Sequence, residues 1–125
     1  MKTIIYSPEA PAPIGPYSQA VLSGDTLYVS GQIAIDQSTG NMVNSTIEVE
    51  TKQVMTNLSY ILKAAGMDFS NVVKCSIFVK NMQHFVKVNE VYGSYFPENP
   101  PARETVEVSA LPKYVNVEIS CIAVK

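Results

Sequence analysis

The stretch TIEVETKQVMTNLSYILKAAGMDFSNVVKCSIFV, residues 46–79, predicts a helix followed by a strand. Over Thr46 to Ala65 the apolar residues recur at the spacing of one helix face, and Gly66 follows as a stop signal. From Val72 onward the pattern changes to alternation, which is typical of a strand with one buried face. We expect that face to carry Val73, Cys75, Ile77 and Val79. This change of period indicates a fold that combines helices and strands.

Towards the N-terminus the pattern predicts a connection and a hairpin. The segment Pro8 to Pro16 is too rich in proline for a helix or a central strand, so we expect an extended connection. Tyr17–Ser23 and Thr26–Ile35 are predicted strands that flank a turn at Gly24-Asp25. A second turn is expected at Ser38–Asn41.

Towards the C-terminus a second helix is predicted after Asn81, which can cap it. Asn89 lies inside the apolar stripe of this helix, so it either hydrogen-bonds within the fold or lies near a site. Prolines at 97, 100 and 101 end the helix. The apolar stripe is formed by Phe85, Val88, Tyr92 and Phe96.

The last strands are predicted to form a hairpin around Leu111–Tyr114. If Ala110 pairs with Val115, the polar faces of the two strands coincide, and this shared face includes Arg103, Thr105 and Glu118. The order ββαβ then αββ predicts a single α+β domain over residues 1–125, with two helices on one face of the sheet. The helix-free face is then a candidate for burial between subunits.

The composition excludes several classes of function. The 125 residues suit one domain, only 16% are charged and the net charge is −2. No bulk attraction to nucleic acid or to acidic membranes is therefore expected, and the low charge suggests an oligomer. One histidine (His84, expected to be exposed) and two cysteines are too few for a usual zinc site. Without a signal peptide or membrane span, we expect a cytoplasmic protein with reduced, buried Cys75 and Cys121.

Two ionisable residues suggest chemistry. Arg103 follows Pro100-Pro101-Ala102, and a guanidinium on a stiff backbone suits capture of a carboxylate. Glu118 can position or deprotonate a water molecule. The alternative is that both are ordinary strand residues or an ion pair between subunits. In the predicted register they are roughly 13 Å apart, so bent strands, leaning side chains or a neighbouring chain would be needed to bring them together.

Short motifs follow one another along nearly the whole chain. They are Ile14–Ala20 (IGPYSQA), Ser30–Ile33 (SGQI), Val88–Tyr92 (VNEVY), Pro101–Arg103 (PAR), Val106–Val108 (VEV), Leu111–Lys113 (LPK) and Val117–Ile119 (VEI). In this order they resemble the RidA (YjgF) family. The resemblance implies a chorismate-mutase-like fold with a six-stranded sheet, assembled as a homotrimer with ligand pockets at the subunit boundaries.

The resemblance also implies an activity without cofactor or metal: hydrolysis of 2-imino acids, such as 2-iminobutanoate and 2-iminopropanoate, to 2-keto acids and ammonia. By the same resemblance, Arg103 binds the substrate carboxylate and Glu118 holds the attacking water. The pocket is expected to be shaped by Tyr17, Ser30, Gly31 and Asn89, with backbone hydrogen bonds at Gly31 and Thr105.

The sequence departs from the family at Glu104-Thr105, where many members have Ser-Cys, and this departure leaves the substrate preference open. Two other functions remain as alternatives. Some relatives carry the names endoribonuclease and translation inhibitor, although the low pI near 5.3 does not favour RNA binding. A non-catalytic protein that senses keto acids or acts as a chaperone is the other.

Overall fold

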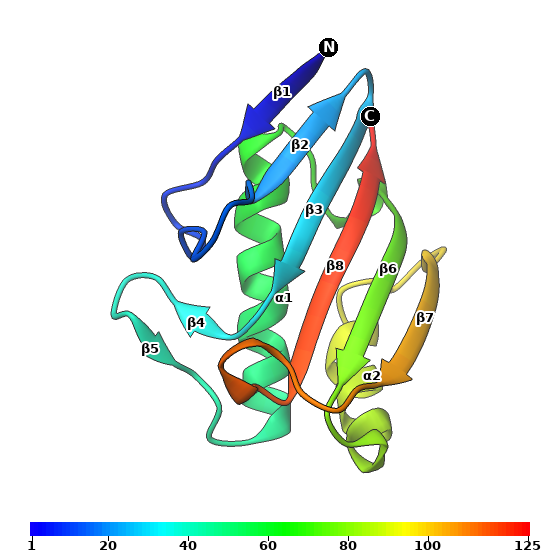
Figure 1. Cartoon of the computed structure of the whole chain (residues 1–125). Helices are drawn as coiled ribbons and strands as arrows, with labels where there is room; N and C mark the ends of the chain where they lie inside the picture. Colours follow the sequence, from blue (N-terminus) through cyan, green and yellow to red (C-terminus); the bar gives the residue numbers. More distant parts are fainter.

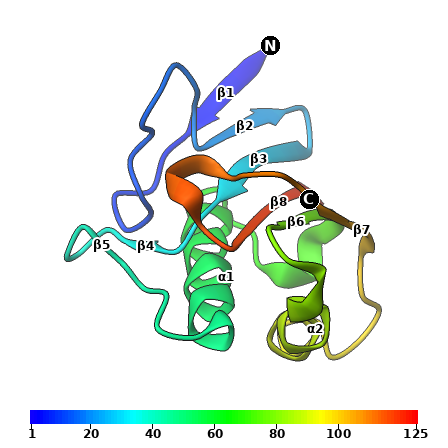
Figure 2. The same cartoon turned by 60° about the horizontal axis from the view of Figure 1, so that its bottom comes forward.

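The computed structural model describes residues 1–125 as a six-stranded mixed sheet with both helices on one face (Figures 1 and 2). The strand order is β1-β2-β3-β8-β6-β7. The strands are β1 Lys2–Ile5, β2 Ala20–Ser23, β3 Thr26–Gln32, β6 Val72–Val79, β7 Ala102–Glu107 and β8 Val117–Val124; the helices are α1 Ile47–Ala64 and α2 Phe85–Gly93. The predicted α+β class, the six strands and the placement of the helices are confirmed.

Short elements complete the chain. A separate small hairpin consists of β4 Ile35–Asp36 and β5 Asn41–Met42, and it contains the turn predicted at Ser38–Asn41. Three 3₁₀ turns lie at Phe69–Asn71, Met82–His84 and Pro112–Tyr114. The strand absent from the predicted order is β1, which pairs with β2 at the edge of the sheet. No helix has the combination of length and apolar character that crossing a membrane requires.

Helix α1 forms where the pattern predicts it. The Thr46 side chain caps its start by accepting a hydrogen bond from the Val49 amide at 3.1 Å. Gly66 follows the helix with a φ of 71°, a conformation that favours glycine. The apolar stripe is buried beneath the sheet, and the fully or almost fully buried members are Val54, Met55, Leu58, Ile61 and Leu62.

The predicted C-terminal hairpin is wrong, because β6 lies between β7 and β8 (Figure 1). Cys75 of β6 is level with Arg103 of β7 on one side and with Cys121 of β8 on the other. Helix α2 connects β6 to β7, and a helical crossover makes the two strands it joins parallel. Alternation in a sequence identifies the residues that share a face but not the neighbouring strand, so Ala110 and Val115 are not partners.

The predicted common polar face is also wrong. Arg103 points to the helix side of the sheet, where its guanidinium lies over the rings of Phe85 and Tyr92 from α2. Glu118 points to the opposite, helix-free face, because its neighbours Val117 and Ile119 are fully buried towards the helices. The two candidate residues therefore lie on opposite faces of the sheet.

One residue of β6 also departs from the predicted alternation. A register irregularity lies between Val72 and Lys74, and it leaves Val73 48% exposed. Val72 is buried in its place. The remaining core positions of this strand, Cys75, Ile77 and Val79, are buried as predicted, and both cysteines are free and buried.

Candidate functional site

A cavity of about 330 Å³ brings four predicted site residues together: Tyr17, Ser30, Gly31 and Glu118. The remaining lining residues are Ile14, Ile33 and Pro112. Three parts of the chain therefore meet here: the proline-rich connection, the end of β3, and the start of β8 together with the turn that precedes it. The cavity combines one carboxylate and a few polar groups with an apolar wall, and it contains no positively charged side chain.

Gly31 leaves the space that the Glu118 side chain occupies. A Cβ atom at position 31 would lie 2.5 Å from Oε2 of Glu118 and 2.7 Å from its Cδ. The pairing of β3 with β8 is irregular between Val29 and Gln32, and such bulges commonly redirect side chains beside functional sites. Burial raises the pKa of Glu118, with no opposing effect from a hydrogen bond or a nearby charge. The carboxylate thus retains its capacity to bind a water molecule.

Part of the cavity wall comes from a loop that includes Ile14 and Tyr17. The predicted strand beginning at Tyr17 starts only at Ala20, so Tyr17 lies in the connection. Its hydroxyl oxygen accepts a hydrogen bond from the Ile14 amide at 3.3 Å. The Ser30 hydroxyl donates to the Ser18 carbonyl at 2.7 Å and leaves its own oxygen available as an acceptor. These contacts fix the Tyr17 and Ser30 hydroxyl groups in the lining of the cavity.

A second cluster surrounds Arg103 on the helix side of the sheet. Its Nη1 donates to Oδ1 of Asn89 at 2.7 Å, and its guanidinium carbon lies 5.1 Å from the Tyr92 ring centroid and 5.7 Å from that of Phe85. Asn89 therefore hydrogen-bonds within the fold to a candidate residue. Thr105 lies on the same face of β7, and its buried hydroxyl has no partner within the chain. Together these contacts hold the guanidinium in one orientation.

The thiols near this cluster are not activated nucleophiles. Burial raises the pKa of Cys75 and raises that of Cys121 to about 12. Both are therefore protonated at neutral pH, and the thiolate is the reactive form. His84, which was expected to be exposed, is half-buried, and its Nδ1 is buried without a partner.

The two clusters do not meet within one chain. Tyr17, Ser30, Gly31 and Glu118 lie together, whereas Arg103, Asn89 and Thr105 lie on the other side of the sheet. The predicted site residues are thus divided into a carboxylate cavity and a guanidinium cluster.

A family model described as Endoribonuclease L-PSP matches residues 7–125. The chain belongs to this family. A RutC family protein of Pyrococcus horikoshii is 50% identical over 125 residues, which cover 100% of this chain and 99% of the relative. The human 2-iminobutanoate/2-iminopropanoate deaminase is 46% identical over 125 residues, which cover 100% and 91%. The crystal structure of a Rid family protein from Yersinia pestis is 45% identical with a TM-score of 0.97, covering 100% of both chains.

Within this L-PSP fold, the sequence patterns had assigned Phe85 and Tyr92 only to the apolar stripe of a helix. The structure places both rings against the Arg103 guanidinium. The available signal was Asn89, a polar residue that shares their helix face. A polar residue within the apolar stripe of a helix, such as Asn89 here, can therefore indicate that its aromatic neighbours contact a charged side chain.

Proposed function

We propose that this protein hydrolyses 2-imino acids such as 2-iminobutanoate and 2-iminopropanoate to 2-keto acids and ammonia, in sites between the subunits of a cytoplasmic homotrimer. The observation that carries the proposal is that the candidate site residues form two separate groups, one around Glu118 and one around Arg103. A 2-imino acid needs a cation for its carboxylate and an acceptor for a water proton, and the cavity around Glu118 has only the acceptor. Membership of one family with the human deaminase supports the reaction.

Arg103 supplies the missing cation from a neighbouring subunit. The aromatic rings and Asn89 hold its guanidinium, so little entropy is lost when it binds a carboxylate in two-pronged geometry. The apolar wall of the cavity receives the short aliphatic side chain of the substrate. This arrangement orients C2 of the imine towards Glu118.

The reaction then needs one proton acceptor. The protonated imine is electrophilic, so the water oxygen bonds to C2 while the Glu118 carboxylate takes a water proton and the C=N electron pair moves to nitrogen. Glu118 returns this proton to the nitrogen of the amino alcohol. The C–N bond then breaks as the hydroxyl oxygen forms the carbonyl, and the hydroxyl proton leaves with ammonia as ammonium. The products are the 2-keto acid and ammonium, and no cofactor takes part.

The helix-free sheet face supports the proposed assembly. Ile4, Val21, Tyr28 and Ile122 are paired in register and form one apolar row across four strands. Ile4 and Tyr28 are about half exposed, at 52% and 51%. A row of this kind is expected to be covered by further copies of the chain.

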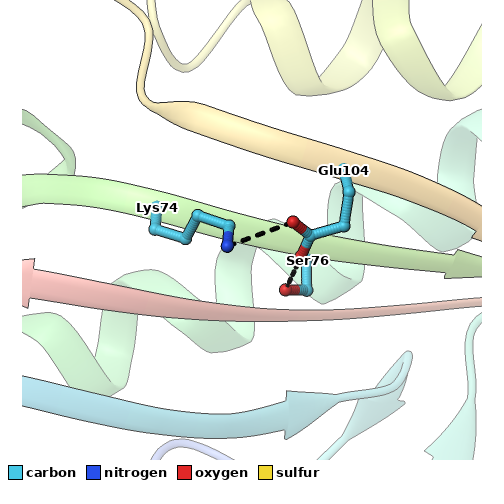
Figure 3. A network of polar contacts seen from close by, with 3 residues as sticks. All are labelled: Lys74, Ser76 and Glu104. Carbon is cyan, nitrogen blue, oxygen red and sulfur yellow. Dashed lines mark hydrogen bonds and ion pairs between the residues drawn. The ribbon is translucent and has the colours of Figure 1, made fainter.

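One pair of charges on the same face, Lys74 and Glu104, is matched within the chain. Lys74 Nζ lies 3.1 Å from Oε1 of Glu104, and Ser76 donates a hydrogen bond to the same carboxylate (Figure 3). Hydrogen bonds from Ser76 and Lys74 lower the pKa of Glu104. Glu104, at the position where the sequence departs from the family, is thus part of a polar cluster on the helix-free face. A neutralised cluster can enter a subunit interface at a lower desolvation cost than a lone charge.

The family description also names an endoribonuclease, but no feature of the cavity favours that chemistry. RNA binding generally requires a basic surface, whereas this cavity is lined by no basic residue and the net charge is −2. A keto-acid sensor would use the same cavity without turnover. Measurement of turnover therefore separates the sensor from the enzyme.

The decisive test couples threonine dehydratase to this protein and follows imine decay in the presence of a trapping amine. We expect the wild type to divert the imine to 2-ketobutanoate before it is trapped. Arg103→Ala is expected to reduce kcat/KM on the order of 100-fold, because the positively charged partner of the substrate carboxylate is lost. Equal decay with the wild type, with Arg103→Ala and without protein would refute the deaminase proposal.

The pH dependence follows from the raised pKa of Glu118. Below that pKa the carboxyl is protonated and cannot accept the water proton, so kcat/KM should fall about tenfold per pH unit on the acid side. Since the pKa is raised, the midpoint of this limb should lie above the ordinary value of 4.5. A pH–rate profile checks this, and a wild-type limb centred at or below 4.5 would contradict it.

Protonation of Glu118 has the opposite effect on stability: turnover needs the carboxylate form, whereas folding favours the protonated form. A carboxyl whose pKa is raised on folding stabilises the protein fully below its unfolded pKa, and this contribution is lost as the pH rises through the folded value. Glu118→Gln should therefore melt at a slightly higher temperature than the wild type at pH 7. In its pH–rate profile, the acid limb caused by Glu118 should be absent. Thermal denaturation of both proteins at pH 7 and pH 4 measures the difference.

A further inference from the structure

A fully buried glutamate supports the strand that carries Glu118. Glu50 lies in the first turn of α1 and is 0% exposed. Its Oε2 accepts hydrogen bonds from the Asn116 amide at 2.8 Å and the Val117 amide at 3.3 Å, while Oε1 accepts from the Asn116 side chain at 2.8 Å. The carboxyl group thus satisfies three donors at the very start of β8.

The turn immediately before these donors is strained. Lys113 and Tyr114 have φ values of 54° and 55°, in the left-handed region that residues other than glycine rarely adopt. The same turn begins with Pro112, which lines the cavity. Such a conformation persists only when the surroundings hold both of its ends.

The turn at Pro112–Tyr114 is flanked by apolar packing and, beyond it, by hydrogen bonds. Leu111 and Val115 are buried in a small apolar cluster with Ile33, another cavity residue. Beyond the cluster the chain is fixed at Asn116, whose carbonyl accepts from the Lys80 amide at 3.0 Å and whose donors are bound by Glu50. Glu50 is the only side chain that hydrogen-bonds the first residues of β8 from the helix layer.

We propose that Glu50 is a positioning residue that keeps Pro112 and Glu118 in place at the cavity. It touches no substrate, since it is 0% exposed and both of its carboxylate oxygens accept hydrogen bonds from Asn116 and Val117. It acts through Asn116 and Val117, one residue before Glu118. Its effect on turnover rests on the proposed deaminase function, whereas its effect on the Glu118 carboxyl does not.

The test compares two replacements of similar length. Glu50→Met keeps the volume but has no strong acceptor, so the Asn116 and Val117 amides lose their partner. Glu50→Gln keeps an amide oxygen for those donors, and its amino group can donate to Asn116 after that side-chain amide turns over. Val54→Ala, one turn further along α1 and fully buried, is the control for a general loss of stability.

The first readout is the titration of the Glu118 carboxyl carbon by ¹³C NMR, which needs no activity. We expect Glu50→Met to lower the Glu118 pKa towards 4.5 as the strand start loosens and water enters, while Glu50→Gln and Val54→Ala titrate like the wild type. Should Glu50→Met fail to fold, Asn116→Ala, which removes one of the three bonds, should move the pKa in the same direction. Titration of the folded variant at the wild-type pKa would overturn the proposal.

The second readout is kinetic. At a temperature where all variants are folded, Glu50→Met should lower kcat about tenfold and move the acid limb of the pH–rate profile to lower pH. Glu50→Gln should stay within about twofold of the wild type. An equal decrease in kcat for Glu50→Met and Val54→Ala, with an unchanged limb, would overturn the positioning role. A wild type without deaminase activity would refute only the proposed function, because the NMR titration still decides the role of Glu50.

Discussion

Mixing two inactive variants, Arg103→Ala and Glu118→Gln, is expected to restore activity. Each variant alone should lose kcat/KM on the order of 100-fold, because one lacks the proposed carboxylate-binding cation and the other lacks the proposed proton acceptor. In mixed assemblies of the proposed trimer, some boundaries would place an intact Arg103 from one chain against an intact Glu118 from the next. Those boundaries form complete sites without any chain being wild type.

The size of the recovery can be derived from the symmetry. In a cyclic trimer each boundary joins two different surfaces of neighbouring chains. With equal amounts of the variants and random assembly, about one quarter of the boundaries combine the intact halves, so activity should recover to about a quarter of the wild-type value. Subunits are exchanged in mild denaturant and returned to buffer, and mass spectrometry of the intact assemblies checks that mixing took place.

A matched control separates complementation from refolding effects. Each variant taken through the same exchange alone should remain inactive, and a mixture of Arg103→Ala with an Arg103→Ala/Glu118→Gln double variant should gain nothing. If verified mixed trimers of the two single variants stay at the level of the separate variants, the divided site is refuted. A protein that sediments as a monomer while turning over imine would refute it as well.

The sequence predicted the elements better than their pairing. Helix α1 and strand β6 lie where the change from helical to alternating period places them, because both bury one apolar face. The partner of β7 could not be found in this way. Residues 102–107 alternate equally well beside β8 or beside β6, and only the crossover through α2 makes β6 the neighbour.

The same limit explains the error at the site. Residue chemistry and the RidA-like motifs both made Arg103 and Glu118 candidates, but the face on which each lies depends on strand pairing. With β6 inserted between β7 and β8, Arg103 turns towards Tyr92 while Glu118 turns away from the helices. The contacts of Glu50 could not be predicted from the sequence, because a glutamate in the first turn of a helix is common and its partners are 66 and 67 residues further along the chain.

Gly31→Ala is expected to reduce kcat/KM on the order of 100-fold with little change in stability, because its Cβ would occupy the place of Glu118, the proposed proton acceptor. The added Cβ would lie within 3 Å of three Glu118 atoms: Oε2 at 2.5 Å, Cδ at 2.7 Å and Cγ at 2.9 Å. A flexible side chain at a cavity can rotate away from such a contact, so the fold should tolerate the change. The carboxylate then leaves the position from which it would hold water against C2.

Gly93→Ala is the matched control, since a Cβ at that helical position meets nothing within 4 Å and should leave activity unchanged. Melting temperatures and kcat/KM of both variants are measured together with Glu118→Gln and the double variant Gly31→Ala/Glu118→Gln. Because Gly31→Ala acts through Glu118, the double variant should be no less active than Glu118→Gln alone. An additive loss in the double variant would mean that Gly31 contributes by its own backbone contact with substrate. Full activity of Gly31→Ala would mean that catalysis does not depend on the position of the Glu118 carboxylate against Gly31.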